Sequence, residues 1–304
     1  MEPKNKALTG CLCALGCEVL FGLSYVFTKK ATDVAGEFEL LGWRFLIAFI
    51  VMSLCAAFGL IRLQSKGKPV RKLIPIVLCS PVVYFIGETV GISHTSAAES
   101  GIFLACIPVV SLIASALILK KKPTKLQVTG IGITLIGVLI TVLAAGMSAS
   151  LSVVGYLFLT AAVISYALYS VFVARAEAFS EAEITWVMLA GGAATFTLIA
   201  LVQALAEGSL AHLVALPFSS IDFLIAVLYQ GIGCSILAFF MSNVAIANIG
   251  VNRTSSFIGA STVVSILAGV LLLNETLTLW QIIGAAVIVA GIYTANAGKV
   301  DTGA

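Results

Sequence analysis

Charged side chains are scarce in this sequence. They make up 10% of the 304 residues, whereas soluble domains contain about 25%. Apolar residues make up 60%, and they form long stretches with little chain between them. This composition excludes a soluble domain of appreciable size and predicts an integral membrane protein.

The sequence also lacks the short motifs of common catalytic sites. It has no phosphate-binding loop, dinucleotide fingerprint, His-Glu-x-x-His or Gly-x-Ser-x-Gly. Its two histidines, His94 and His212, are far apart in predicted connections. None of the seven cysteines forms a Cys-x-x-Cys pair, so free thiols are expected. We therefore expect no catalytic residue, no metal site, no cofactor and no enzymatic activity.

Ten apolar stretches are long enough to cross a membrane as helices. Crossing the hydrocarbon layer takes about 20 apolar residues. The first stretch is too long for a signal peptide and no small-residue cleavage site follows it, so we interpret it as the first membrane helix. The expected spans are residues 8–29, 39–61, 73–93, 97–119, 125–146, 152–174, 183–206, 220–242, 251–273 and 278–296.

Basic residues predict the orientation of these spans. Alternation of ten spans divides the connections into two sets, and one set contains only Lys29 and Lys30. The positive-inside rule makes the other set cytoplasmic, so both termini are expected in the cytoplasm and the protein in the plasma or inner membrane. The net charge of +3 comes mainly from these flanks and predicts no nucleic-acid partner. The cytoplasmic set contains Lys4, Lys6, Arg62, Lys66, Lys68, Arg71, Lys72, Lys120, Lys121, Lys122, Lys125, Arg175, Arg253 and Lys299.

The two halves of the chain resemble each other. The sequence from Val19 to Ala31 returns from Ile164 to Ala176, and Val109-Val110-Ser111 returns as Val263-Val264-Ser265. Because each half contains five spans, an odd number, the second copy must enter the membrane from the opposite side. The expected fold is therefore an all-α membrane protein with two inverted five-helix repeats, residues 1–147 and 148–304, around a central cavity.

Three ionisable residues lie well inside predicted spans: Glu18, Arg44 and Glu88. A charge at the centre of the bilayer costs on the order of 2.5–3.5 kcal/mol or more, so each needs a partner or a function. All three lie in the first half. Helix packing that both repeats share therefore does not require them.

Glu18 lies near the middle of the first span, where no basic side chain is predicted. Because desolvation disfavours an unpaired charge, Glu18 is a candidate for a carboxyl that is protonated at rest and couples transport to protons. It is equally suited to bind a cationic substrate. The structural alternative is a neutral acid that hydrogen-bonds a neighbouring helix. Gly22 and Tyr25 share its helix face, and Tyr25 offers a hydroxyl and an aromatic wall.

Arg44 and Glu88 are expected at similar depth and can form an ion pair between the second and third spans. An anion-binding role for Arg44 is the equal alternative. Glu88 shares a helix face with Tyr84 and Gly91, and that face is expected to line a cavity. Glu88 is therefore a second candidate for a proton or cation site.

Polar and aromatic groups in the second half are further candidates for substrate contacts. Such residues more often hydrogen-bond a neighbouring helix, and this alternative applies to each of them. Pro81 and Pro108 interrupt spans of the first half and are expected to border a cavity. Thr262 replaces Pro108 in the second half, which predicts that the break is not symmetric. The candidates are Tyr166, Tyr169, Tyr229, Gln230 and Asn243.

Several segments resemble EamA-type permeases of the drug/metabolite transporter superfamily. The resemblance covers essentially the whole chain, and it implies ten helices, cytoplasmic termini, a central cavity and export of small metabolites or drugs. Glu18-Val19 before a glycine also resembles the first helix of the small multidrug resistance proteins, which implies that Glu18 binds protons and organic cations. The segments are Phe21 to Lys30, Trp43 to Ala48, Thr95 to Gly101 with Pro108, and Leu271 to Thr278 with Gln281, Gly284 and Gly291.

Two transport hypotheses follow. In the first, a monomer exports a small metabolite or amino acid by alternating access, coupled to protons through Glu18, with Arg44 binding a carboxylate. In the second, Glu18 and Glu88 bind an organic cation, drug or polyamine in exchange for protons. A non-transporting receptor or scaffold is the remaining alternative, and it does not explain carboxyls at depth in one repeat alone.

Overall fold

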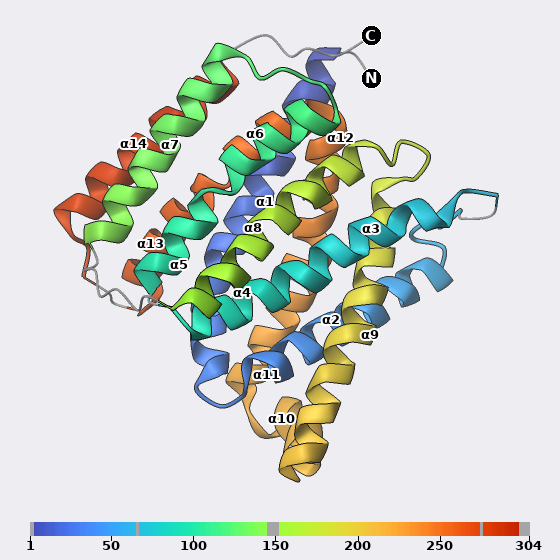
Figure 1. Cartoon of the computed structure of the whole chain (residues 1–304). Coiled ribbons are helices and arrows are strands. Elements are labelled where there is room, and N and C mark those ends of the chain that lie inside the picture. The colour runs from blue at the N-terminus through green and yellow to red at the C-terminus, as the bar shows by residue number, and fades with distance from the viewer. Residues whose placement is uncertain (1–2, 65–66, 96, 145–151, 274–275, 298–304) are drawn as a thin grey trace.

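The computed structural model describes the whole chain except residues 1–2, 65–66, 96, 145–151, 274–275 and 298–304. Throughout the described residues the regular structure is helical, with no strand. The helices lie side by side in one bundle, and α1 begins and α14 ends at the top of the view in Figure 1. The all-α fold expected from the sequence is confirmed.

The first half contains five apolar segments, of which two are interrupted. The first, second and fifth are the uninterrupted helices α1, α2 and α7. The third begins with the 3-10 turn η1 and passes through the π-helical turn η2, and the fourth is divided into α5 and α6. The bounds are α1 (Pro3–Thr32), α2 (Glu37–Ala57), η1 (Val70–Leu73), α3 (Ile74–Val77), η2 (Leu78–Val83), α4 (Tyr84–Ser93), α5 (Ala97–Ala105), α6 (Ile107–Ile118) and α7 (Lys125–Ala144).

The second half follows the same order, with one additional helix between its second and third segments. The longer connection that the sequence predicts there contains the short helix α10, which follows Gly208 with a φ of 68°. The bounds are α8 (Val153–Ala174), α9 (Glu181–Glu207), α10 (Leu210–Ser219), α11 (Ile221–Leu228), η3 (Tyr229–Ala238), α12 (Phe239–Ser256), α13 (Gly259–Leu273) and α14 (Leu279–Asn296).

Both prolines that the sequence marked do interrupt their helices. Ser80, before Pro81, has the non-helical angles φ −144° and ψ 121°. Pro108 lies in the first turn of α6, just after the turn at Cys106. A proline lacks the backbone N–H and clashes with the preceding turn, which explains both positions.

The expectation that only the first half breaks its fourth segment is wrong. Residues 251–273 turn at Phe257 and Ile258, close to Ala260, the repeat equivalent of Cys106. The third segment of the second half is likewise π-helical, in η3. Neither of these interruptions contains a proline, so no residue type marks them in the sequence.

The count of ten spans is not confirmed. Nine helical segments of the described chain are long and apolar enough to cross a membrane, and one of them, Ile221–Ser256, runs through the expected start of the ninth span. Gly250 breaks that segment with φ 77° and ψ 168°, a conformation open essentially only to glycine. The remainder, α13, has 15 residues, fewer than the roughly 20 that a full crossing takes.

The glycines that recur in both halves bring α7 and α14 together. A Cβ on Gly130 would lie 2.6 Å from the Gly291 carbonyl oxygen, and one on Gly137 would lie 2.8 Å from that of Gly284. Gly130 and Gly284 are repeat equivalents, as are Gly137 and Gly291. The contact is therefore reciprocal, as a two-fold relation between inverted copies requires. Small residues permit this close approach in lipid.

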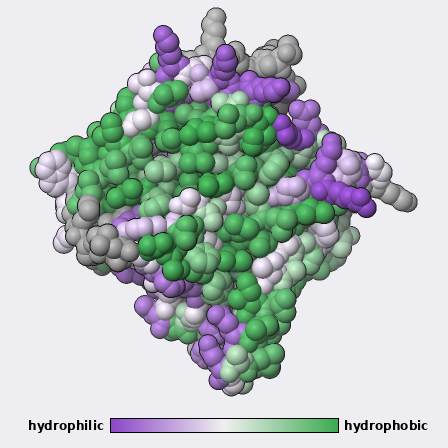
Figure 2. All heavy atoms as spheres, viewed as in Figure 1, coloured by the Kyte–Doolittle hydropathy of each residue, from purple (hydrophilic) through white to green (hydrophobic). Residues whose placement is uncertain are grey.

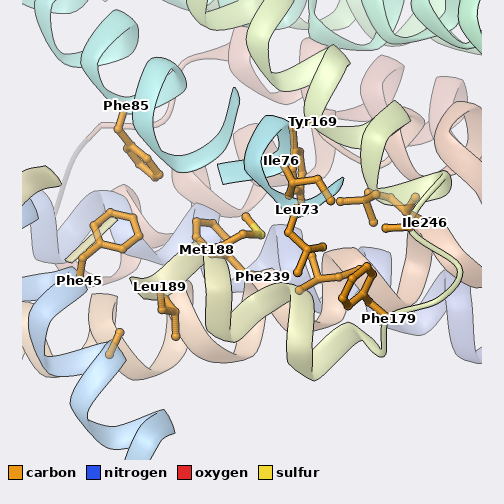
Figure 3. Packing of buried hydrophobic residues seen from close by; sticks show 14 of the residues in the cluster. Phe45, Leu73, Ile76, Phe85, Tyr169, Phe179, Met188, Leu189, Phe239 and Ile246 are labelled. Carbon is orange, nitrogen blue, oxygen red and sulfur yellow. The ribbon is translucent and has the colours of Figure 1, made fainter. Parts of the chain in front are cut away.

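Aromatic rings fill the centre of the bundle. Phe45 of α2 packs 5.5 Å from Phe85 of α4 and 5.2 Å from Phe196 of α9, measured between ring centroids. Figure 3 shows Phe45 and Phe85 next to Met188 and Leu189 in this core. The outer surface is also apolar, and in Figure 2 hydrophobic residues cover the middle of the visible face while hydrophilic residues gather at its margins. This distribution suits a protein surrounded by lipid.

Candidate functional site

Glu18 points toward α13. Its side chain is 6% exposed, and Ser261 of α13 lies near its carboxyl. The Ser261 hydroxyl donates to the Ile258 carbonyl at 2.6 Å. One turn later, a Cβ on Gly22 would lie 2.7 Å from the Ser261 carbonyl oxygen, so glycine permits α1 and α13 to touch. The predicted acid therefore lies at a helix contact between the two halves.

Tyr25, on the same face of α1, lies nearer the surface. It is 41% exposed, and the Lys29 ammonium lies 5.8 Å from its ring centroid. Together with Ser265 and Gln281 it lines a small cavity of about 160 Å³. The structure thus separates Tyr25 from the tyrosines of α4 and α8.

Arg44 is buried and only partly hydrogen-bonded. Its Nε donates to Ser235 Oγ at 2.7 Å, and Nη1 donates to Gln230 Oε1 at 3.3 Å. The guanidinium carbon lies 4.9 Å from the ring centroid of Phe85 and 5.3 Å from that of Phe45. Nη2 is also buried, and within the described part of the chain it has no hydrogen-bond partner. A buried donor left unpaired costs about 1–3 kcal/mol.

Gln230 and Tyr229 of η3 both reach α1. Gln230 Nε2 donates to Thr28 Oγ1 at 2.9 Å. The Tyr229 hydroxyl donates to the Leu20 carbonyl at 2.9 Å, and its ring stacks on Phe27 with centroids 4.0 Å apart. Tyr229 therefore holds η3 against α1, whereas Gln230 belongs to the surroundings of Arg44.

The expected ion pair between Arg44 and Glu88 is not formed. Glu88 accepts a 2.8 Å hydrogen bond from the Tyr84 hydroxyl one turn earlier, and among the described residues no nitrogen of Arg44 lies within 4.0 Å of its carboxylate. Ser235 and Gln230 on η3 instead accept from two of the Arg44 nitrogens, Nε and Nη1. This leaves the carboxyl of Glu88 with a phenol as its partner.

Tyr84 begins a line of aromatic and polar groups that crosses the bundle. Its ring centroid lies 5.4 Å from that of Tyr166, which lies 5.6 Å from that of Tyr169. The Tyr169 hydroxyl donates to Asn243 Oδ1 at 2.7 Å, and Asn243 Nδ2 donates to Thr185 Oγ1 at 3.0 Å. The predicted residues of α4, α8 and α12 therefore meet in one cluster.

Sequence reasoning missed the small hydroxyl residues that complete these contacts. Thr28, Thr185, Ser235 and Ser261 carry no signal of their own in an apolar span. The one available hint was the pair Cys79-Ser80, which returns as Cys234-Ser235 in the second half.

The larger cavity lies elsewhere, at one end of the bundle. It measures about 610 Å³ and is open to the surface. Neither this cavity nor the one at Tyr25 is lined by Glu18, Arg44 or Glu88, whose side chains pack against their neighbours. The lining consists of Thr32, Val34, Ala35, Gly36, Glu37, Phe38, Glu39, Ser93, Gln203, Ala204, Glu207, Ser209 and His212.

A family model described as the EamA-like transporter family matches the chain twice, over residues 8–143 and 153–297. The chain belongs to this family. "Uncharacterized transporter YcxC" of Bacillus subtilis (strain 168) is 30% identical over 96% of this chain and 94% of its own. "Uncharacterized transporter YyaM" of the same organism is 24% identical over 93% of this chain and 92% of its own.

Two further comparisons concern one part of the chain and the fold. A 75-residue part of the chain is 36% identical to "WAT1-related protein At4g08300" of Arabidopsis thaliana, covering 25% of this chain and 20% of that one. A crystal structure that is 18% identical superposes over 96% of both chains with a TM-score of 0.77, which shows the fold. The EamA protein is therefore a multi-pass membrane transporter and not an enzyme, in contact with the bilayer and a small-molecule substrate.

Proposed function

We propose that this EamA transporter exports a small organic solute with a carboxylate group, such as an amino acid, by alternating access. The observation that carries the proposal is the buried, unpaired Nη2 of Arg44. A carboxylate is the natural partner for a guanidinium, because two N–H groups can bind its two oxygens. Nε and Nη1 of Arg44 already donate to protein groups, so a carboxylate would supply the missing acceptor for Nη2.

The surroundings of Arg44 indicate the rest of the solute. Phe85 and Phe45 flank the guanidinium, and Tyr84 packs against Phe85 with ring centroids 5.1 Å apart. Aromatic walls favour an apolar or aromatic side chain beside the carboxylate. An amino group would find the carboxyl of Glu88, which accepts from Tyr84 at present.

Glu18 is the residue that we assign to proton coupling. It is buried beside Ser261, and the ion pair of the described residues, Lys68 with Glu183, does not involve it. An unpaired acid in such surroundings favours the neutral form, and hydration during the cycle favours ionisation. This difference would link release of a proton to a change of conformation.

The charge distribution supports an orientation with cytoplasmic termini. Lys68, Arg71 and Lys72 follow α2, and Lys120, Lys121 and Lys122 follow α6, all at the end where α1 begins. The positive-inside rule then makes the large cavity extracellular. We propose a location in the cell membrane, residues 1–147 and 148–304 as the two repeats, and a monomer as the transporting unit.

Exchange of organic cations is the second candidate. It is favoured by the buried carboxyl of Glu18 and the part-buried carboxyl of Glu88, near the tyrosine cluster of Tyr84 and Tyr166. Aromatic faces and carboxylates together bind organic cations and polyamines. In this version Arg44 is a structural residue.

Flux measurements on purified protein in liposomes distinguish these functions. We expect saturable exchange of amino acids or related carboxylates, faster with an imposed pH gradient, and competition by other carboxylates. Competition by lipophilic cations alone would replace the first candidate with the second. Absence of saturable flux across a broad panel of solutes would contradict transport and favour a receptor or scaffold.

A further inference from the structure

Glu183 ties the start of α9 to the connection that follows α2. Its Oε2 accepts Lys68 Nζ at 2.6 Å and the Ser180 amide at 2.8 Å, and its Oε1 accepts the Gln64 amide at 2.7 Å. The Lys68 ammonium also lies 5.5 Å from the ring centroid of Phe179. We call these five residues the latch. It joins the two halves of the chain at one end of the bundle.

The start of α2 is the repeat equivalent of the start of α9. Gly36 is the N-cap of α2 as Ser180 is of α9, and Glu39 accepts the Gly36 amide at 2.8 Å as Glu183 accepts that of Ser180. Counted from these caps, Ala35 corresponds to Phe179. Gly36, Glu39 and Ala35 all line the 610 Å³ cavity.

The N-terminal ends of α2 and α9 therefore have different surroundings. At the latch, Lys68 lies against Phe179 and Glu183. At the other end, the equivalents Ala35 and Glu39 face open space, and Ser209 of the connection after α9 lies across the cavity. In the described part of the chain, Glu39 forms no ion pair within 4.0 Å.

Two further repeat-equivalent contacts are unequal. Ser265 Oγ donates to the Gly22 carbonyl at 3.0 Å, whereas its equivalent, Ser111, is buried without a hydrogen-bond partner among the described residues. The Arg175 guanidinium, near the latch, donates to the Ile118 carbonyl. No such bond is formed by its equivalent, Lys30, within the described chain.

Each end of the bundle also has one tryptophan hydrogen bond. Trp43 Nε1 donates to the Leu213 carbonyl at 2.9 Å at the cavity end, and Trp186 Nε1 donates to Ser53 Oγ at 3.0 Å at the latch end. The acceptor lies in α10 at the cavity end and in α2 at the latch end.

We propose that the latch is a conformational switch held by the Lys68–Glu183 ion pair. It is closed in this structure and opens when the cavity at Glu39 closes. The inference rests on the proposed alternating access. Inverted repeats exchange their local geometries when the transporter changes state. In the other state, Lys68 leaves Phe179 and Glu183, and the connection after α9 fills the space beside Glu39.

The energetics of the latch suit a reversible contact. Lys68 is 28% exposed at its side chain, so its ammonium returns to water at small cost. After release, the Ser180 amide at the helix N-terminus still stabilises the Glu183 carboxylate. The Glu183 side chain is 5% exposed in the closed state, so in the open state the backbone amide and entering water replace Lys68 as its partners.

Cysteine reporters in full-length protein in lipid nanodiscs test the latch. Ser209→Cys reports the cavity, and Ala176→Cys, at a position that is 3% exposed, reports the latch end. Labelling by a membrane-impermeant maleimide is compared with protein that has only the native cysteines. We expect Lys68→Gln to raise labelling at position 176 about threefold to fivefold and to lower it at position 209.

Matched variants control the experiment. Lys68→Arg keeps the ion pair and should label as wild type, and so should Lys72→Gln, which removes an exposed charge nearby. Glu183→Gln keeps one acceptor oxygen for the Ser180 amide and removes the ion pair together with the acceptor of the Gln64 amide. It should reproduce Lys68→Gln even if that variant folds poorly. An increase at position 176 with no decrease at position 209 means local loosening and overturns the proposal, as does no change at either position.

Flux of the wild-type protein separates this inference from the proposed function. Saturable flux with reporters that do not respond to Lys68→Gln rejects the latch and leaves transport intact. Reporters that respond as expected in a protein without flux for any solute support the conformational exchange and reject the proposed transport.

Discussion

Substitution of Arg44 by glutamine tests the carboxylate site most directly. The variant removes the charge and the unpaired Nη2, while an amide remains to contact η3. A hydrogen bond to a charged group is worth about 1.5–3 kcal/mol. We therefore expect transport efficiency for a carboxylate solute to fall roughly 10-fold to 150-fold.

The effect of this substitution on stability should be small. The variant loses the bonds from Arg44 to Ser235 and Gln230, each worth about 1 kcal/mol in general. It also removes a buried unpaired donor that costs about 1–3 kcal/mol. The opposing contributions are similar in size, so the thermal unfolding temperature should stay close to that of wild type.

The assay compares an amino acid with the amine that lacks its carboxylate, both as substrates of counterflow into liposomes. Arg44→Gln should reduce flux of the amino acid and leave flux of the amine nearly unchanged. Ser235→Ala is the matched control, because it removes a partner of Arg44 and keeps the guanidinium. Equal loss for both solutes, or no loss for either, would refute a carboxylate site at Arg44.

Three further predictions concern coupling, packing and backbone shape. Glu18→Gln should abolish pH-driven flux in liposomes while leaving solute exchange and size-exclusion behaviour intact, and unchanged pH-driven flux would remove Glu18 from the coupling. Gly137→Val should destabilise the protein by about 1–3 kcal/mol, because its Cβ would lie 2.7 Å from the Ile288 amide nitrogen. Thermal unfolding measures this change. Gly132→Ala is the control and should have no effect, because a Cβ there meets nothing within 4 Å. Gly250→Ala should lower the unfolding temperature through about 1–3 kcal/mol of backbone strain, and an unchanged temperature would show that the local chain relaxes.

Periodic features of the sequence predicted the fold well. Apolar stretches located the helices. The glycines that recur in both halves lie at a close contact between α7 and α14. The breaks at Phe257 and Gly250 were not predicted as breaks, because a turn inside an apolar segment depends on tertiary packing when no proline is present. Residues 207–219 were expected as a connection, and the helix α10 within them has 10 residues, too few for a span.

The candidate site was predicted less completely. The cost of burying a charge singled out Glu18, Arg44 and Glu88. In the structure Glu18 and Arg44 are buried, and Glu88 is part-buried. Their partners were not predictable, because hydroxyls such as Ser235 and Ser261 are compatible with any span. The expected pairing of Arg44 with Glu88 was wrong for a related reason. The depth of a residue can be counted along its helix, but the sequence does not give the rotation of one helix relative to its neighbours.

The distribution of charge over the repeats follows from their pseudo-symmetry. Helix contacts such as the glycines of α7 and α14 are reciprocal, so both copies must keep them. The ionisable residues are not duplicated: Val163 is the equivalent of Glu18, and Met188, counted from the helix caps, is the equivalent of Arg44. A two-fold copy of either would bring a second like charge toward the middle of the bundle, where such repulsion is weakly screened. Under the proposed alternating access, a symmetric scaffold with a single-copy site would let the two halves exchange conformations while one set of polar groups binds the solute in both states.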